Sequence, residues 1–460
     1  MPTVSEALAQ IATELRFEDL PPEVVAKAKL HVLDTLGVAL AAARLDFGAA
    51  ARQVAEDFGG PPTCSVIGSP RRLPGVWAAF VNGVLAHGLD YDDTHAESVV
   101  HVNATVTPAA LAACEEANAG GRTFLTAVAL GMEANIRLGL VAPGAFHDRG
   151  FHPTGVCGAY ASALVAGKVA SFDAAALANA LGLAGSQASG TMEFLTDGTW
   201  SKRLHAGWAA HGGLVAARLA AAGYTGPRAT LEGRFGLYRS HLGAVDVDLS
   251  VLTRGWHKQW HLLETSLKPY PCCHMTHAFI DCAAALQQAH RFRLDSIERI
   301  ECFIHPREVP VVCEPQAGKH DPQTDYDAKF SLPYCVASML VRGHVELDDF
   351  TETAIRESPV LALAHRIVYR DDPQNDYPLH FGGWMRVHLR GGKVVEHREP
   401  INRGHADKPL SDEAVREKFR ANAKTVLSEG KIEQVVDAIG ALDHLPTIDS
   451  LTQPLRGGNS

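Results

Sequence analysis

The chain has 460 residues and a formal net charge of −10, with 46% hydrophobic and 20% charged residues. This balance is typical of a folded globular protein and unlike that of a disordered chain. No block of lysine and arginine marks a nucleic-acid surface, and no apolar run approaches the roughly 20 residues of a membrane span. The nine cysteines are scattered and odd in number, which favours reduced thiols over a disulfide framework. We therefore expect a cytoplasmic protein that binds neither nucleic acid nor membrane.

Helices are predicted throughout the first 268 residues. Thr3 and Glu6 form a capping box that opens the first helix, and Pro22 starts a second that runs to about Ala43. Further helical patterns cover 74–87, 109–117, 123–140, 155–169, 174–183 and 206–222. The segment 155–169 is almost wholly Ala, Val, Gly and Leu, which is typical of a helix buried on every side.

The pattern changes after Lys268. Alternating apolar residues predict a strand over 297–305, and a hairpin is predicted over 384–399 around Gly391 and Gly392. Helices are predicted at 277–290, 331–342 and 409–442. We therefore expect a mainly α protein with a large all-helical domain, 1–268 completed by 403–460, and a smaller α+β domain, 269–402.

The most informative stretch runs from His87 to Pro108. It sets four acids and three histidines between two apolar helices: Asp90, Asp92, Asp93, Glu97, His87, His95 and His101. Ionisable groups between apolar helices are costly to desolvate unless they are paired or used in chemistry. The alternatives are a polar, solvated loop, a Mg²⁺ site at the three aspartates, or aspartates that orient neighbouring basic groups.

Two other places combine polar groups with a helix N-terminus. His152 and Thr154 precede the most apolar helix, where free N–H groups favour an anion, although Thr154 as an ordinary N-cap is the alternative. Lys202 lies at the entry to another helix, close to His205. A cation is unfavourable there unless an anion offsets it, which makes Lys202 a candidate carboxylate ligand, against the alternative that it extends to solvent.

The segment from Cys272 to His277 contains two cysteines and two histidines at short spacing, and such residues can bind a zinc ion. No second ligand pair lies elsewhere at suitable spacing, and adjacent cysteines rarely bind one ion together, so we predict no metal. Tyr334 lies in an apolar helix, where a phenol is usually a core residue with one satisfied hydrogen bond.

Short motifs across nearly the whole chain resemble the MmgE/PrpD family, which includes 2-methylcitrate dehydratase, cis-aconitate decarboxylase and iminodisuccinate epimerase. The matching pieces are Leu33-Asp34-Thr35-Leu36-Gly37, His87-x-x-Asp90-x-Asp92-Asp93-Thr94, Phe151-His152-Pro153-Thr154, Lys202-x-x-His205-x-Gly207, Leu231-Glu232-Gly233-Arg234-x-Gly236, Pro409-Leu410-Ser411 and Lys418-Phe419. The resemblance implies a helical domain with an inserted lid domain, a homodimer, and cofactor-free chemistry on a small di- or tricarboxylic acid.

The resemblance also implies which residues form the site. The family's pocket positions resemble Asp90, Thr94, His101, His152, Lys202 and Tyr334 here, with His277 from the lid. We assign catalysis to Asp90, His101, His152, Lys202 and Tyr334, and substrate binding to Thr94, Thr154, His205 and His277.

Such residues suit removal of a proton next to a carboxylate, which needs a base of near-neutral pKa and cations that stabilise the developing charge. We expect Lys202 and the helix N-terminus at Thr154 to hold carboxylates, His101 or His152 to transfer the proton, and Asp90 to orient an imidazole. Tyr334 would protonate a leaving hydroxyl or the carbanion.

The expected function is a lyase resembling 2-methylcitrate dehydratase. Activities resembling cis-aconitate decarboxylase or iminodisuccinate epimerase are alternatives, because one carbanion intermediate serves all three reactions. From other classes, the alternatives are a non-catalytic metabolite-binding homologue and a metal-dependent hydrolase that uses Asp90, Asp92 and the Cys272–His277 cluster.

Overall fold

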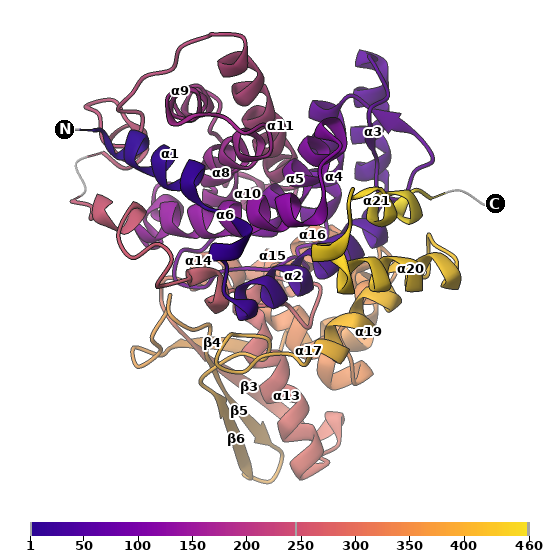
Figure 1. Ribbon diagram of the computed structural model, residues 1–460. Helices are drawn as coiled ribbons and strands as arrows, with labels where there is room; N and C mark the ends of the chain where they lie inside the picture. Colours follow the sequence, from indigo (N-terminus) through magenta and orange to yellow (C-terminus); the bar gives the residue numbers. More distant parts are fainter. Residues whose placement is uncertain (1, 244–245, 458–460) are drawn as a thin grey trace. The chain divides into compact units, whose positions relative to one another are not determined.

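The computed structural model describes residues 2–243 and 246–457 (Figure 1). About 57% of the chain is helical, and the strands form two small sheets, so the prediction of a mainly α protein is confirmed. The chain divides into two compact units. The first comprises the described residues within Met1–Met192, Ser201–Thr265 and Ser411–Ser460, and the second comprises Glu193–Trp200 and Ser266–Leu410. That the second unit serves as a lid stays a prediction.

The first unit is built from helices around a buried centre. Its helices are α1 Val4–Glu14, α2 Pro22–Ala42, α3 Asp46–Phe58, α4 Gly75–His87, α5 Asn103–Ala117, α6 Gly121–Leu140, α7 Ala145–Asp148, α8 Pro153–Val169, α9 Ala174–Gly185, α11 Ser201–Ala221, α12 Leu237–Leu242, α19 Asp412–Ala423, α20 Glu429–Gly440 and α21 Asp449–Leu455. Two short strands, β1 Cys64–Ser65 and β2 Arg72–Leu73, form an antiparallel pair, so the expectation of an all-helical domain was wrong in this detail.

Helix α8 is the central helix, as its composition predicted. Nearly all its residues are buried, and it packs against α5, α6, α9 and α11. Helices α4 and α11 also approach each other closely, because Gly83 faces Gly207: a Cβ on Gly83 would lie 2.7 Å from the Cα of Gly207. Small residues thus bring together two helices whose ends carry His87 and Lys202.

Helix α5 begins earlier than the sequence indicated. We expected a helix only after Pro108, but the helix starts at Asn103 and includes Pro108 as its sixth residue. The carboxylate of Asp93 accepts the backbone N–H of Asn103 and so satisfies one donor of the first turn. Because proline lacks only one intrahelical hydrogen bond, this capped and fully buried turn tolerates it.

The second unit has a four-stranded sheet in the order β4-β3-β5-β6. Strand β3 pairs parallel with β4 and antiparallel with β5, and β5 and β6 form the predicted hairpin. Helix α13 packs on β5 and β6 (Figure 1). The elements are α10 Phe194–Asp197, α13 His277–His290, β3 Ile297–Ile304, α14 Val309–Val312, α15 Gln316–His320, α16 Asp325–Lys329, α17 Leu332–Arg342, α18 Ser358–Ala364, β4 Ile367–Asp371, β5 Gly383–Leu389 and β6 Val394–Glu399.

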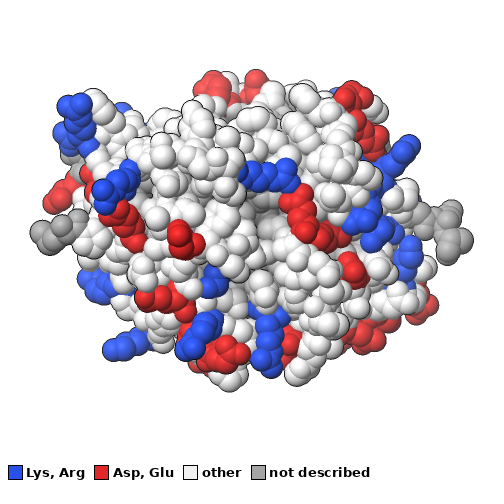
Figure 2. Space-filling model, turned by 45° about the horizontal axis from the view of Figure 1, so that its top comes forward, with Lys and Arg blue, Asp and Glu red and all other residues white. Residues whose placement is uncertain are grey.

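No helix among the described residues is both long and apolar enough to cross a membrane. On the face shown in Figure 2, lysines and arginines are interspersed with acidic and uncharged side chains.

Candidate active site

The polar stretch between α4 and α5 is buried. Asp92 and Asp93 have no exposed surface, and Asp90 and His87 are equally enclosed by the helices of the first unit. The alternative of a polar, solvated loop is therefore wrong. Asp90 has a positive φ of 53°, an uncommon conformation for a residue other than glycine, so the chain turns sharply where α4 ends.

Asp92 holds two imidazoles at the centre of this cluster. Its Oδ2 accepts hydrogen bonds from Nδ1 of His87, at 2.8 Å, and from Nδ1 of His101, at 3.0 Å. Burial alone would raise the pKa of the Asp92 carboxyl, but the two imidazoles outweigh burial and hold that pKa well below its usual range. An ionised Asp92 fixes the tautomer of each ring, so Nε2 is the atom on which either imidazole exchanges a proton.

Asp90 and Lys202 form a buried ion pair beside these rings. Lys202 Nζ donates to Asp90 Oδ1 at 2.5 Å, and both side chains are almost fully enclosed. Lys202 is the second residue of α11, so Asp90 is the anion that offsets a cation at that helix N-terminus. Asp90 Oδ1 lies 3.7 Å from Nε2 of His101, beyond hydrogen-bonding distance. The expected hydrogen bond that orients an imidazole is therefore made by Asp92 rather than by Asp90.

His152 and His205 form a second pair of rings. Nδ1 of His152 lies 3.0 Å from Nδ1 of His205, and the His152 ring stacks on His87 with centroids 5.3 Å apart. Burial, with smaller electrostatic contributions from the His205 ring and from Lys202, holds the pKa of His152 well below its ordinary value. Burial also lowers the pKa of His205 to about 4. Both imidazoles are therefore neutral near pH 7.

Thr154 connects α8 to the cluster. Its Oγ1 accepts the backbone N–H of His101 at 3.0 Å, so the side chain positions His101. The N-cap of α8 is His152 rather than Thr154. Thr94 lies in the same buried stretch as Asp92. The structure thus brings seven predicted residues into the first unit: Asp90, Thr94, His101, His152, Thr154, Lys202 and His205.

The other two predicted residues, Tyr334 and His277, belong to the second unit. Tyr334 lies in α17, where its hydroxyl donates to the carbonyl of Asp349 and accepts from Arg342 at 3.3 Å. Burial raises the pKa of Tyr334 to about 12. His277 starts α13, and its Nε2 donates to the carbonyl of Cys272 at 3.2 Å. The roles assigned to both residues stay predictions.

Sequence reasoning missed three residues that support the cluster. His87 was noted only as the start of the polar stretch, yet it shares Asp92 with His101. His31 of α2 donates from Nδ1 to Asp93 at 2.6 Å, and both side chains are fully buried. Asn103 donates to the same carboxylate from its backbone and its side chain. No local pattern marks His31, because its partner lies 62 residues away.

Groups of three or more potential metal ligands lie close together among the described residues. His87, His101 and His152 present ring nitrogens within 4.8 Å of one another, as do Asp90, Asp92 and His101 with their donor atoms. Cys272 belongs to no such group in the described ranges. Of the ligands that the metal-dependent hydrolase alternative would use, Asp90 and Asp92 therefore belong to a donor group in the part of the chain that the structure describes, whereas Cys272 does not.

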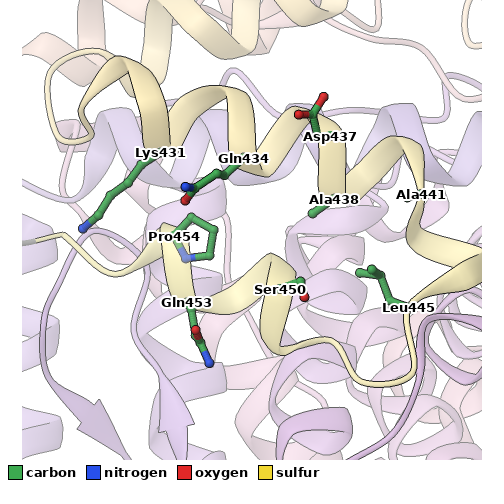
Figure 3. Close-up of a pocket in the computed structure, with 9 residues that line it drawn as sticks. All are labelled: Lys431, Gln434, Asp437, Ala438, Ala441, Leu445, Ser450, Gln453 and Pro454. Atoms are coloured by element: carbon green, nitrogen blue, oxygen red, sulfur yellow. The ribbon is translucent and has the colours of Figure 1, made fainter.

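A separate hollow of about 630 Å³ lies between α20 and α21 (Figure 3). It is lined by Lys431, Gln434, Asp437, Ala438, Ala441, Leu445, Ser450, Gln453 and Pro454. None of these side chains belongs to the histidine cluster, and the lining offers one lysine beside one aspartate. This lining lacks the convergent imidazoles and cations that carbanion chemistry requires.

Family models match most of the chain. The MmgE/PrpD N-terminal domain matches residues 6–250, and the MmgE/PrpD C-terminal domain matches residues 270–442. The chain belongs to the MmgE/PrpD family, as its motifs predicted, and it is an enzyme of the lyase or isomerase type.

Relatives with assigned activities align over almost their whole length. A cis-aconitate decarboxylase of Homo sapiens is 30% identical over 470 residues, covering 99% of this chain and 95% of the relative. A cis-aconitate decarboxylase-like protein, oryM, of Aspergillus oryzae is 27% identical and covers 99% and 97%. A cis-aconitate decarboxylase of Aspergillus terreus is 26% identical and covers 98% and 96%.

Proposed function

We propose that this chain is a cofactor-independent lyase that acts on a small tricarboxylic acid through a carbanion next to a carboxylate, and that cis-aconitate is the first substrate to test. The observation that carries the proposal is the buried Asp90–Lys202 pair next to an imidazole, His101, that a carboxylate holds in one tautomer. The similarity to cis-aconitate decarboxylases over nearly the full chain favours decarboxylation over the other reactions of the family.

Decarboxylation of an unsaturated tricarboxylic acid makes two demands on the enzyme. The bond from carbon to one carboxylate breaks, CO₂ leaves, and the electron pair spreads into the adjacent double bond and a remaining carboxylate. A cation must stabilise this charge, and an acid must deliver a proton to carbon. We assign the cation to Lys202 and the proton to Nε2 of His101.

The environments of the two histidines distinguish their roles. His101 bonds to the ionised Asp92, which stabilises its protonated form and suits a proton donor. His152 is neutral because burial and nearby charges lower its pKa, so it suits a hydrogen-bond partner of the substrate. We assign Thr94 and His205 of the first unit to substrate binding, and the roles of His277 and Tyr334 of the second unit stay predictions.

Dehydration of a 2-methylcitrate-like substrate is the second candidate. A neutral imidazole can accept the proton next to a carboxylate, and the lowered pKa of His152 keeps that ring neutral over the physiological range. Epimerisation would use the same abstraction with the proton returned to the opposite face. The substrate's leaving group then decides among the three outcomes.

We further propose that the enzyme is a homodimer. The first unit presents aromatic side chains on α3, α4 and α11: Phe58 stacks on Trp77 with centroids 4.5 Å apart, and Trp208 stacks on His211 at 5.2 Å. Phe58 is 67% exposed and Trp208 40% exposed, which suits a face covered by a second copy. Light scattering of wild type and Trp208→Glu tests this, and a monomeric wild type contradicts it.

Proton NMR in D₂O tests the reaction. Chelator-treated protein is incubated with cis-aconitate, citrate, 2-methylcitrate and iminodisuccinate. Loss of CO₂ from cis-aconitate with one deuterium in the product identifies the decarboxylase, whereas water loss or α-deuterium exchange identifies the other branches. Lys202→Ala should abolish turnover. Lys168→Met is the matched control, because Lys168 is a half-buried lysine of the same unit that donates to the carbonyl of Thr13.

Absence of turnover with all four acids, in a protein with a native circular dichroism spectrum, would overturn the substrate class. It would favour a non-catalytic metabolite-binding homologue. Turnover that survives Lys202→Ala would instead overturn the assignment of Lys202 as the cation.

A further inference from the structure

A second cluster of histidine and carboxylate lies in the second unit, in two loops that flank β5 and β6. His380 precedes β5, and its two ring nitrogens both face carboxylates: Nδ1 lies 2.7 Å from Asp376 Oδ2, and Nε2 lies 3.2 Å from Asp407 Oδ2. Asp407 belongs to the turn that follows β6. One imidazole therefore bridges two loops that are 27 residues apart in the sequence.

The contacts of His380 require a positive charge between its Nε2 and the carboxylate of Asp407. A neutral imidazole has one N–H, and a carboxylate only accepts. The shorter contact places the proton of His380 on Nδ1, toward Asp376. Nε2 then presents a lone pair to an oxygen of Asp407, and two acceptors at 3.2 Å repel each other unless a positive charge lies between them. That charge is either a second proton or a metal ion.

His405 supplies another nitrogen at the same place. Its ring centroid lies 4.7 Å from that of His380, and its Nδ1 lies 3.6 Å from Asp407 Oδ2. This Nδ1 also accepts the backbone N–H of Asp407 at 3.1 Å, a contact that an ion bound at Nδ1 would replace. One donor atom from each of His380, His405 and Asp407 lies within 4.8 Å of the others. In a tetrahedral zinc site with bonds of about 2.0–2.1 Å, donors are roughly 3.4 Å apart, so a small contraction brings the three together around an ion.

Burial and access also suit an ion. The side chains of His380 and His405 are only 14% and 7% exposed, whereas that of Asp407 is 64% exposed and faces solvent. A hollow of about 240 Å³ whose lining includes Asp376 and His380 opens beside them. The two nitrogens are therefore largely fixed, and an ion can enter from the solvent side.

We propose that His380, His405 and Asp407 form a binding site for a divalent transition-metal ion with a preference for nitrogen and oxygen ligands, such as Zn²⁺. Asp376 orients His380 by accepting its Nδ1–H, an arrangement common around metal-bound histidine. Three protein ligands leave a position for water. The ion ties the loop before β5 to the turn after β6 and stabilises the second unit.

A similar cluster in the first unit shows why geometry distinguishes this site. His95, His261 and Glu264 also place three donors within 4.8 Å. However, Nδ1 of His95 accepts the backbone N–H of Ser98 at 3.2 Å, so its Nε2 carries the proton and donates to Glu264 at 3.3 Å. A neutral His95 thus satisfies all its partners without a cation, whereas His380 does not.

Zinc titration of the full chain tests the proposal. Chelator-stripped wild type, His380→Asn, Asp407→Asn and Asp376→Asn are titrated with Zn²⁺ by calorimetry. His365→Asn is the matched control, because Nε2 of His365 contacts a single carboxylate, that of Asp321, at 3.0 Å in the same unit. Wild type and the control should bind one equivalent more than His380→Asn and Asp407→Asn. Asp376→Asn keeps the ligands and should weaken binding about 10- to 100-fold.

Thermal unfolding gives a second readout that does not depend on activity. Zn²⁺ should raise the Tm of wild type and of His365→Asn, and should leave that of His380→Asn unchanged. Equal stoichiometry and affinity in wild type, His380→Asn and Asp407→Asn would overturn the site. So would an equal loss in His365→Asn, because zinc would then be binding to dispersed surface histidines.

Discussion

Replacing Asp92 with asparagine tests whether one carboxylate organises the catalytic imidazoles. Asp92 Oδ2 accepts from His87 at 2.8 Å and from His101 at 3.0 Å. An amide oxygen carries no charge, so each bond loses its ionic character, and the stabilisation of a protonated His101 is lost with it. A hydrogen bond to a charged group contributes about 1.5–3 kcal/mol. At about 1.4 kcal/mol per tenfold in rate, we expect kcat to fall roughly 10- to 200-fold through His101 alone.

The assay is steady-state decarboxylation with wild type and Asp92→Asn over a range of pH. Because Asp92 is assigned no contact with substrate, kcat should fall while KM changes little. The pH profile should also shift, because the proton donor loses the anion that favours its charged form. His31→Asn is the matched control: His31 and Asp93 form another fully buried imidazole–carboxylate pair, at 2.6 Å, that is assigned no catalytic role.

Two results would refute this reasoning. One is an Asp92→Asn enzyme with a native fold whose kcat stays within about twofold of wild type. The other is a loss of kcat in His31→Asn as large as that in Asp92→Asn, because the effect would then arise from general disruption of the buried loop. A urea unfolding curve for each variant separates activity from stability.

Four further variants, one of them a double variant, test other charged and titratable groups of the first unit. Lys202→Met should destabilise the protein by about 3–5 kcal/mol, because it removes the cation that pairs with the buried carboxylate of Asp90. The double variant Asp90→Asn, Lys202→Met should recover stability in urea but not activity. Burial lowers the pKa of His205 from 6.5 to about 4. The neutral ring therefore contributes about 3 kcal/mol to the free energy of unfolding above pH 6.5, and this contribution is lost as the pH falls toward 4. In His205→Gln, the free energy of unfolding should depend less on pH over this range. Lys418 pairs with buried Asp34 at 2.7 Å, and burial raises the pKa of Asp34 to about 6. Lys418→Met should therefore lower the free energy of unfolding more at pH 7.5 than at pH 5, where Asp34 is protonated. Equal losses of stability at the two pH values would contradict this.

Periodicity and capping in the sequence predicted the helices well where the local signal was strong. The helix over 277–290 and the strand pair around Gly391 have almost the predicted limits, because each is bounded by turn residues and has a clear apolar repeat. Helix α3 was missed because Asp46–Phe58 carries few apolar residues and few buried positions, although the apolar residues it has lie on one face. Proline at 108 delayed the predicted start of α5, because the hydrogen bond from Asn103 to Asp93 is not visible in sequence.

The sequence predicted which residues form the candidate site, but not which of those residues form hydrogen bonds with one another. Motif resemblance identified Asp90, His101 and Lys202, and the structure places them within one unit. It could not show that Asp92 holds His101, because that contact depends on the conformation of the loop after α4, where Asp90 has a positive φ. Contacts between residues far apart in the chain, such as that of His31 with Asp93, depend on helix packing and leave no local pattern.

The position of His101 is fixed from two sides, and this explains why one site can serve several reactions. Asp92 holds its ring from the loop after α4, and Thr154 holds its backbone from the first turn of α8. These two contacts set the position at which His101 would donate or accept a proton, and that position does not depend on which bond of the substrate breaks. In the proposed mechanism, Lys202 beside Asp90 likewise responds to charge on a carboxylate rather than to the group that leaves. On that proposal the acid–base set of the first unit would select carbanion chemistry, and the orientation in which the remaining contacts hold the substrate would select among decarboxylation, dehydration and epimerisation.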